Sequence, residues 1–576
     1  MANSLFRRKS IDRILAESAA GRTDAHGQPG MHQILTVRDL TLMGVAAVIG
    51  GGIFSTIGAA AFNGGPGVVF LFLITAMTCG FTAMCYAEFA SRVPVSGSAY
   101  TYSYVTFGEV VAWIIGWALI LEYAIGNIVV AISWSAYFNN ILHAVGINLP
   151  DWLTTGYQTA KMAHTDALSQ GKPVADLVYS RAPQIGGYPF IINLPAFIIV
   201  MLVTLLAYIG MHESKRTANM MVFIKIAVLV FIAAIGLWYI FSEGTTANWT
   251  PFFPNGMGGV LKGVSAVFFA YIGFDAISTT AEECKDPQRD LPRSMLYALL
   301  ICTAIYVTTA LVITGMVNYR EFEGVTDPLA YVFDKLNMKS IGFIISVSAV
   351  VAATSVLLVF QLGQPRIWMS MSRDGLLPKS FGRIHARFKT PSFATIVSGL
   401  LVGILVLFVD DRLMTDLTSI GTLFAFVLVS GGVLLLPRLE KRAGKFNMPY
   451  FNGKWLIPAL YLLFAWLFSD RLRSSLMQLD NEGYQEILFL TFMILAGILS
   501  ILTFIRNYSV IPVMGVLCCM YLMIEIPAKS WLVFFGWMAF GLIIYLIYGK
   551  RHSRLAQGSE EGGDLSDISP NTTKQP

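Results

Sequence analysis

Residues 48–54 read Val-Ile-Gly-Gly-Gly-Ile-Phe and interrupt the apolar stretch that covers residues 40–62. Consecutive glycines weaken a helix, because each costs about 1 kcal/mol relative to alanine in a helix interior. Within a bilayer, an opened helical turn is tolerated only where it is buried in protein or lines a cavity. The stretch therefore predicts a broken membrane helix, although a seam of small residues packed against a neighbouring helix explains the glycines equally well.

A second interruption lies in the apolar stretch 259–281, where residues 268–275 read Phe-Phe-Ala-Tyr-Ile-Gly-Phe-Asp. By itself this segment is more typical of an aromatic-rich helix with one glycine. Two interruptions at matching places in two halves of five spans instead indicate an inverted-repeat transporter, in which paired broken helices form a binding site near the bilayer midplane. The first break would free amides, which suit a carboxylate, and the second would free carbonyls, which accept from an ammonium group. Together they predict a site for a zwitterionic α-amino acid.

The composition is that of an integral membrane protein. Of the 576 residues, 55% are hydrophobic and 13% are charged, whereas soluble domains carry about 25% charged residues. The apolar runs are continuous and long enough to cross a ~30 Å hydrocarbon core as helices. We therefore expect an all-α membrane bundle of about fourteen spans, near residues 40–62, 67–91, 107–137, 191–211, 218–241, 259–281, 295–317, 340–366, 393–409, 416–437, 455–469, 486–505, 509–526 and 530–549.

Basic residues predict the orientation. They gather in loops 366–389 and 438–454 and at the start of the tail, all on the side that the positive-inside rule assigns to the cytoplasm. The polar N-terminus lacks the apolar core of a cleavable signal. We expect a multi-pass protein of the cell membrane with both termini in the cytoplasm. Its expected parts are a cytoplasmic N-terminal segment (1–38), a ten-helix transport core (39–438), additional membrane helices (439–550) and a disordered cytoplasmic tail (551–576), with a long external loop near 140–190.

Two ionisable residues lie inside predicted spans, Glu122 in the third and Lys225 in the fifth. Intramembrane charges are costly and are functional candidates by default, so both are candidates for proton coupling. Lys225 has the alternative of extending its amine to the nearby cytoplasmic surface, and Glu122 that of a structural hydrogen bond. Thr354 and Ser355 of the eighth span offer oxygens for a sodium ion. An ammonium at Lys225 close by would disfavour sodium, which favours proton coupling.

Several other classes of function find no support in the residues. The net charge of +5 is not arranged as a basic face, so no nucleic-acid partner is expected. The six cysteines show no metal or redox spacing, and the spans hold no nucleophile–base set, so we expect no cofactor, no metal site and no enzymatic activity. A channel should show a polar stripe through several spans, and a membrane sensor should carry a soluble output domain; the sequence favours neither.

Several short motifs accompany the two breaks, and together they support a resemblance to a known family from about residue 35 to 550. The chain resembles the amino acid/polyamine/organocation (APC) permease superfamily, and within it the bacterial permeases that are similar to cationic amino acid transporters. The segments that carry this resemblance are Tyr-Ala-Glu-Phe-Ala at 86–90, Pro-Val-Ser-Gly-Ser-Ala-Tyr at 94–100, Gly-Phe-Asp at 273–275, Ala-Glu-Glu at 281–283, Pro-Gln-Arg at 287–289 with Pro292, and Ser-Arg-Asp-Gly-Leu-Leu-Pro at 372–378.

The resemblance implies a core of the LeuT type, with 5+5 inverted repeats in the first ten spans. It implies that Lys225 stands where sodium-coupled relatives hold an ion, and that Glu122 stands at an acidic position linked to proton coupling. It places the substrate carboxylate on the amides near Gly51 and Gly52, and the α-amino group on carbonyls of the two breaks. The expected substrate-binding residues are Val48, Gly50, Gly51, Gly52, Ile53, Phe269, Ala270, Ile272, Phe360 and Gln361.

Three departures from the family pattern affect this reading. Gly51 stands where members usually carry Ser or Thr, so one hydroxyl contact to the carboxylate is lost. Ala118 stands where an Asp is common, which removes a proton relay through that point. The chain also carries two spans, near 455–469 and 486–505, before the usual last pair, as in the fourteen-span members, many of which carry cationic amino acids.

The sequence therefore predicts a secondary active transporter for amino acids that uses proton symport and alternating access. Its expected partners are the amino acid, protons as the coupling ion and the lipid bilayer. A cationic side chain would need an acid in the pocket, and the expected lining residues Phe360 and Gln361 are not acidic, which favours neutral amino acids. The alternatives are an amino acid exchanger and a transporter of arginine or lysine.

Overall fold

The computed structural model of the chain describes residues 7–9, 35–50, 52–93, 98–210, 214–325, 327–436, 445–477 and 484–556. Several predicted features lie outside these residues. They are Gly51, the motif residues 94–97, most of the N-terminal segment, the basic residues of 437–444 and the tail from 557 onward.

The described chain is built of helices, which confirms the predicted all-α membrane class. Nine of its stretches are long and apolar enough to cross a membrane, and four shorter apolar helices of 10–17 residues accompany them. One of the nine, Val37–Arg92, contains both the first and the second predicted span. The number of fourteen crossings and the 5+5 arrangement stay predictions.

The first half of the predicted core begins with the broken span, which consists of α2 (Val37–Val48), the π-helical turn η2 (Gly52–Thr56) and α3 (Ile57–Gly64). The next elements are η3 (Gly65–Gly67), α4 (Val68–Arg92), the short α5 (Ser98–Thr106) and the long α6 (Glu109–Ala144). The loop that was predicted to be external follows with η4 (Asp151–Leu153), α7 (Tyr157–Ser169), α8 (Val178–Arg181) and a hairpin of β1 (Gln184–Ile185) and β2 (Tyr188–Pro189), and then come α9 (Leu194–Ile209) and α10 (Ser214–Glu243).

The second half begins with the other broken span, made of α11 (Gly256–Leu261), α12 (Val264–Phe269) and the 3₁₀-helix η6 (Phe274–Glu283), which η5 (Thr245–Trp249) precedes. It continues with α13 (Pro287–Met316), η7 (Tyr319–Phe322), α14 (Pro328–Lys335), α15 (Lys339–Arg373), η8 (Lys379–Gly382), α16 (Ser392–Val406) and α17 (Asp411–Leu435). The C-terminal part holds α18 (Leu456–Leu467), α19 (Ser469–Met477), α20 (Tyr484–Arg506), α21 (Val510–Met523), α22 (Ala528–Ile544), η9 (Tyr545–Gly549) and α23 (Lys550–His552).

Capping residues mark where two of these helices begin. The side chain of Asn193 accepts from the amide of Ala196 at the start of α9, and Asp410 accepts from the amide of Leu413 at the start of α17. A side-chain oxygen at this position satisfies one of the amides that a helix start leaves without an intrahelical partner. The sequence thus fixes these two boundaries locally.

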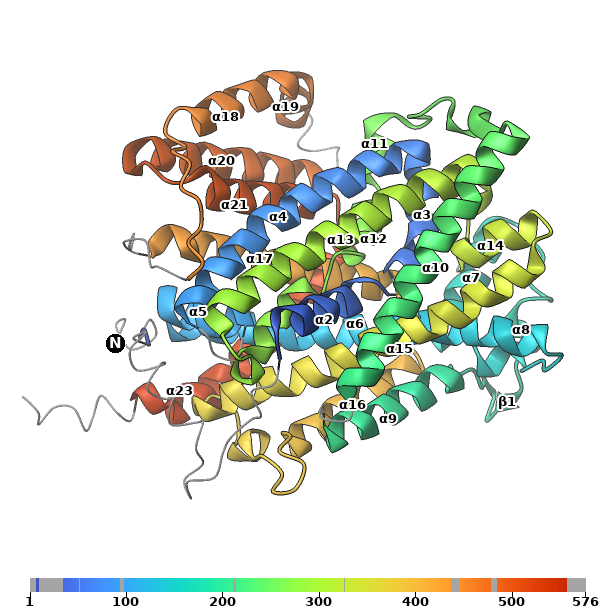
Figure 1. Ribbon diagram of the computed structural model, residues 1–576, viewed down its shortest axis with the longest axis horizontal. Coiled ribbons are helices and arrows are strands. Elements are labelled where there is room, and N and C mark those ends of the chain that lie inside the picture. The colour runs from blue at the N-terminus through green and yellow to red at the C-terminus, as the bar shows by residue number, and fades with distance from the viewer. Residues whose placement is uncertain are drawn as a thin grey trace, which may run out of the picture.

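Burial separates an interior from a lipid-facing shell. The interior is formed by α2, η6, α6, α13, α15 and α17, which contact one another extensively, whereas α9 and α16 lie together at the lower edge of the view in Figure 1. The outer helices expose large apolar side chains, for example Leu205 of α9, Trp238 of α10 and Ile404 of α16. Such exposure suits contact with lipid, because apolar side chains gain nothing by leaving hydrocarbon.

The C-terminal helices form a group of their own. In Figure 1 the orange and red helices α18, α19, α20 and α21 gather at one corner of the molecule. This group joins the core through α21, which packs on α4 and α17. It has a small apolar core around Phe489, Phe492 and Ile524, separate from the main one.

Segments from the two ends of the chain meet on one face. Lys9 pairs with Asp374, which follows α15, at 2.7 Å between Nζ and Oδ1. The amide of Arg554 donates to the carbonyl of the same Asp374 at 3.1 Å, and the hydroxyl of Ser553 donates to Glu109 at 2.6 Å. The two ends therefore lie on the same side of the protein, and its assignment to the cytoplasm stays a prediction.

Candidate functional site

The first break follows directly after α2. The helix ends at Val48, Ile49 adopts an extended conformation with φ −78° and ψ 98°, and the π-helical turn begins at Gly52. A Cβ on Gly50 would lie 2.2 Å from Cγ2 of Val356, and one on Gly52 would lie 2.3 Å from the Cα of Ala270. Position 52 therefore accepts only glycine, because the contact there is with backbone, and a larger residue at position 50 would require Val356 to move. The predicted weak turn is thus also a place of very close packing.

The second break lies against the first. Here α12 ends at Phe269 and η6 begins at Phe274, and between them Gly273 has φ +113°, a conformation that other residues rarely adopt. The hydroxyl of Thr56 lies 2.8 Å from the carbonyl oxygens of both Gly52 and Ala266. One side chain therefore links the two broken spans.

The carbonyls at the end of a helix lack intrahelical partners. Tyr306 of α13 provides a hydroxyl as a partner for one such carbonyl in each break. Its hydroxyl lies 2.7 Å from the carbonyl oxygen of Val48 and 2.8 Å from that of Ala270. A hydroxyl has one proton to donate, and each carbonyl has two lone pairs, so both oxygens keep capacity for an ammonium group. Sequence reasoning missed Tyr306, for which the only signal is a tyrosine inside an apolar span.

Lys225 of α10 supplies the other partner at the end of α2. Its ammonium donates to the carbonyl oxygens of Ala46 at 2.8 Å and Ile49 at 2.6 Å, and to the hydroxyl of Ser355 at 2.9 Å. All three N–H donors of the ammonium are used, and the side chain is fully buried. The amine thus points into the protein toward the first break, and not to the surface as the snorkelling alternative requires.

The predicted sodium ligands are engaged elsewhere. Ser355 accepts from Lys225 and donates to the carbonyl of Ala352 at 2.7 Å. Thr354 accepts from the indole of Trp134 at 2.9 Å. The lysine amine therefore contacts Ser355 directly, whereas Thr354 faces Trp134 of α6; the preference for protons over sodium stays a prediction.

Two buried carboxylates face the same interior region. Glu122 is 2% exposed and Asp275 1% exposed, and they lie close enough to interact electrostatically. Among the described residues, Oε2 of Glu122 and both carboxylate oxygens of Asp275 have no hydrogen-bond partner of good geometry, as is also true of the Tyr86 and Tyr123 hydroxyls. An unpaired buried carboxylate is costly, so this cluster is suited to hold a proton or to receive a polar group.

The two predicted residues of α15 differ in their surroundings. Phe360 packs against Tyr123 with the rings tilted and their centroids 5.5 Å apart, and it covers Gly126 of α6. The Gln361 amide donates to the hydroxyls of Thr204 and Ser398, each at 3.1 Å. Gln361 therefore lies between α15, α9 and α16, and the structure does not bring it to the two breaks.

The remaining predicted residues surround the breaks. Ile53 of the π-helical turn is fully buried, Phe269 is 5% exposed and Ile272 is 3% exposed. The first amides of a new helix have no intrahelical partner, so those of Gly52 and Ile53 remain suited to a carboxylate. Gly51 lies outside the described residues, so its place in this set stays a prediction.

A cavity of about 1170 Å³ lies beside the helical segments that follow the first break and precede the second. Its inner part is lined by Ser55 and Thr56 of the first broken span and by Ala266 of the second. Its mouth includes Lys262 and Arg412, which are exposed. At the far end of η6, a buried ion pair joins Glu283 to Arg366 at 2.6 Å. The cavity thus extends from the exposed residues Lys262 and Arg412 to the helical segments that flank the breaks.

The chain is similar to known proteins over most of its length. A family model described as amino acid permease matches residues 35–476, and a model of the C-terminus of amino acid permeases matches residues 507–553. The chain is 35% identical to the branched-chain amino acid permease BcaP of Bacillus subtilis (strain 168), over 97% of this chain and 100% of that protein.

Two further relatives show how widely the solutes of similar proteins differ. The chain is 32% identical to a methylthioribose transporter of the same organism, over 96% of this chain and 99% of that protein. It is 37% identical to a vacuolar cationic amino acid transporter of Arabidopsis thaliana, over 75% of this chain and 63% of that protein.

Proposed function

The chain belongs to the amino acid permease family, and from this premise we propose that it moves neutral amino acids across the membrane by proton symport with alternating access. The observation that carries the proposal is the ammonium of Lys225, which donates to the carbonyls of Ala46 and Ile49 beside the first break. The proposed substrate site and the coupling group then lie on the same stretch of backbone. Lys225 contacts the end of α2, and the amides of Gly52 and Ile53, which are proposed to bind the substrate carboxylate, begin the next helical segment.

Proton transfer at Lys225 alters that backbone in the proposed cycle. The charged amine has three N–H donors for three acceptors. After it releases its proton it has two donors and no charge, so one acceptor loses its partner and the end of α2 loosens. The carboxylate of the amino acid, bound at the neighbouring amides, experiences this change directly. Glu122 and Asp275 are the proposed acceptors and donors of the proton on the inner side.

The preference for neutral solutes rests on the lining of the cavity. Its charged residues are three basic and three acidic ones, so the entry route has no net charge that would select cations or anions. Phe269 ends α12 at the second break and is an apolar residue that is almost fully buried. A relative described as a branched-chain amino acid permease supports side chains such as that of leucine.

Cationic amino acids are the second candidate, because one observation favours them. Glu122 and Asp275 are buried acids without complete hydrogen bonding, and a lysine or arginine side chain would satisfy them. A relative described as a cationic amino acid transporter shares 37% of its residues with this chain over the matched region. The choice between the two candidates depends on whether a solute side chain reaches this pair.

The test is uptake of labelled leucine into sodium-free proteoliposomes, with and without an imposed inward proton gradient. Accumulation that requires the gradient is the expected result. Counterflow that ignores the gradient would show an exchanger and overturn the symport proposal. Unlabelled arginine is added in parallel, and strong competition by arginine together with absent leucine uptake would replace the neutral substrate class by the cationic one.

A further inference from the structure

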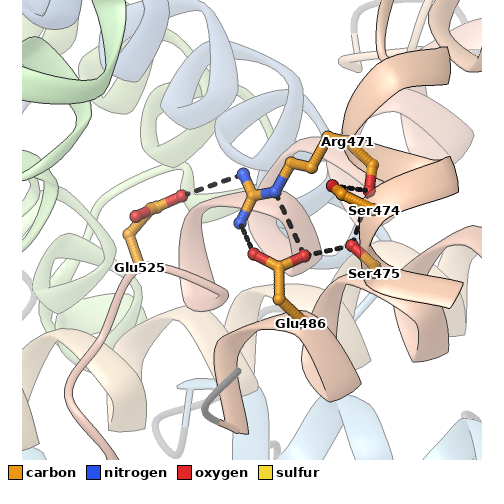
Figure 2. Close-up of polar contacts among 5 residues, drawn as sticks. All are labelled: Arg471, Ser474, Ser475, Glu486 and Glu525. Atoms are coloured by element: carbon orange, nitrogen blue, oxygen red, sulfur yellow. Dashed lines mark hydrogen bonds and ion pairs between the residues drawn. The ribbon is translucent and has the colours of Figure 1, made fainter. Parts of the chain in front are cut away.

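A charged cluster of the C-terminal helices lies at the mouth of the cavity and has no part in the mechanism above. Arg471 of α19 pairs with Glu486 of α20, with 3.1 Å between Nη2 and Oε1. It also pairs with Glu525, which follows α21, with 3.6 Å between Nη1 and Oε1 (Figure 2). Arg471 and Glu525 line the same cavity as Thr56 and Ala266, which flank the two breaks. The cluster therefore borders the open space that lies next to the proposed substrate site.

One side of the Arg471 guanidinium is firmly held. Its Nε and Nη2 donate to the two oxygens of Glu486 at 3.5 and 3.1 Å, and the hydroxyl of Ser475 also donates to Glu486. The guanidinium carbon lies 4.7 Å from the centre of the Phe489 ring. Figure 2 shows the arginine fixed in this way between the two glutamates. Its orientation is therefore set before any solute arrives.

The other side of the guanidinium keeps donor capacity. The 3.6 Å between Nη1 and Glu525 exceeds a hydrogen-bond length, and the structure gives Nη1 no hydrogen bond within the described residues. Arginine binds carboxylates through a planar fork of donors. An oxygen of an incoming carboxylate can therefore be bound at Nη1 without breaking the bonds to Glu486.

We propose that Arg471 and Glu525 form an entry site for zwitterionic α-amino acids, in which the solute carboxylate binds Nη1 of Arg471 and its ammonium group pairs with Glu525. The inference rests on the proposed function and extends it to the C-terminal helices. Opposite charges 3.6 Å apart match the separation of the two charged groups of an amino acid. Both side chains keep contact with solvent, at 27% and 16% exposure, so the solute binds weakly and can move on to the breaks.

Such a site affects how fast the solute binds and not how fast the bound solute is transported. Charges at the rim of a binding site change mainly the association rate and its dependence on salt. Loss of one charge of the pair should therefore raise the KM for a neutral amino acid and leave the maximal rate nearly unchanged. The effect of a partly exposed pair is about two- to fivefold at low ionic strength.

The test compares Glu525→Gln with the matched control Glu243→Gln in proteoliposome uptake of labelled leucine. Glu243 is an exposed acid at the end of α10, outside the described lining of the cavity. Glu525→Gln leaves the bonds between Arg471 and Glu486 in place, so the cluster stays folded, which a thermal melt verifies. We expect KM to rise about two- to fivefold at low salt and this difference to shrink at high salt, with the control unchanged.

A second variant, Arg471→Gln, should raise KM in the same way. Unchanged KM in both variants, or a fall in maximal rate without a change in KM, would overturn the entry site while the proposed function stands. If the unaltered protein takes up no amino acid at all, the proposed function fails and the entry site fails with it. The two failures are thus distinguished by the unaltered protein.

Discussion

Replacing Lys225 by methionine tests the proposed coupling most directly. Methionine is also unbranched and nearly fills the space of the lysine stem, but it offers no donor and no charge. The change leaves the carbonyls of Ala46 and Ile49 without the ammonium that contacts them at 2.8 and 2.6 Å. Each buried acceptor that loses its partner costs about 1–3 kcal/mol, so the variant should lose about 2–6 kcal/mol of stability, which a thermal melt in detergent detects.

The functional expectation follows from the energy of the gradient. An inward gradient of one pH unit supplies about 1.4 kcal/mol per proton, which supports at most about tenfold accumulation of one solute per proton. The unaltered protein should approach this ratio for leucine in proteoliposomes. Lys225→Met should bring leucine only to equal concentrations on both sides, while counterflow of leucine continues.

The matched control is Lys339→Met, which removes an exposed lysine at the start of α15. It should accumulate leucine like the unaltered protein. If Lys225→Met still accumulates leucine in response to the gradient, Lys225 is not the coupling group. Loss of counterflow as well as accumulation, in a variant that a thermal melt shows to be folded at the assay temperature, would show instead that the lysine is needed for substrate binding itself.

Three further changes probe the breaks. Gly52→Ala places a Cβ 2.3 Å from the Cα of Ala270 and should abolish leucine uptake and lower the melting temperature, since neither backbone can yield cheaply; normal uptake would contradict the close contact of the breaks. Tyr306→Phe removes a hydroxyl shared by two carbonyls, which should cost about 1 kcal/mol of stability and change the KM for leucine several-fold at little change in maximal rate. Glu122→Gln keeps the size of a carboxyl that lacks a partner at Oε2 and should flatten the pH dependence of uptake, and an unaltered pH profile would assign Glu122 a structural role.

Hydropathy predicted the helices well because a membrane span is a continuous run of apolar residues, which the sequence shows directly. The expected span 486–505 is α20 (Tyr484–Arg506), and the expected span 191–211 is α9 (Leu194–Ile209). The short α19 (Ser469–Met477) was not predicted, because its polar sequence shows no apolar run. It nevertheless carries Arg471, so hydropathy alone misses part of the cavity mouth.

The glycines predicted the two breaks, but the prediction included only one of the two roles that these glycines have in the structure. Sequence reasoning treated the glycines as weak points of a helix, whereas Gly52 is required because Ala270 of a distant span touches it. The position of Gln361 away from the breaks could not be predicted from the sequence either, because its partners Thr204 and Ser398 come from two other helices. Local pattern identifies a candidate residue, and tertiary contacts decide which face of its helix meets the site.

The end of α2 explains why a lysine and a carboxylate-binding turn belong together. The C-terminus of a helix carries partial negative charge and the N-terminus of the next carries partial positive charge, so a break places both within a few residues. Here Lys225 contacts the carbonyl end at Ala46 and Ile49, and the turn that starts at Gly52 carries the amides that bind the carboxylate in the proposed site. In the proposed mechanism proton and substrate therefore act on opposite sides of one break. Each then changes the affinity for the other by the same factor, as linkage requires, so uptake should respond to pH most strongly when leucine is below its KM.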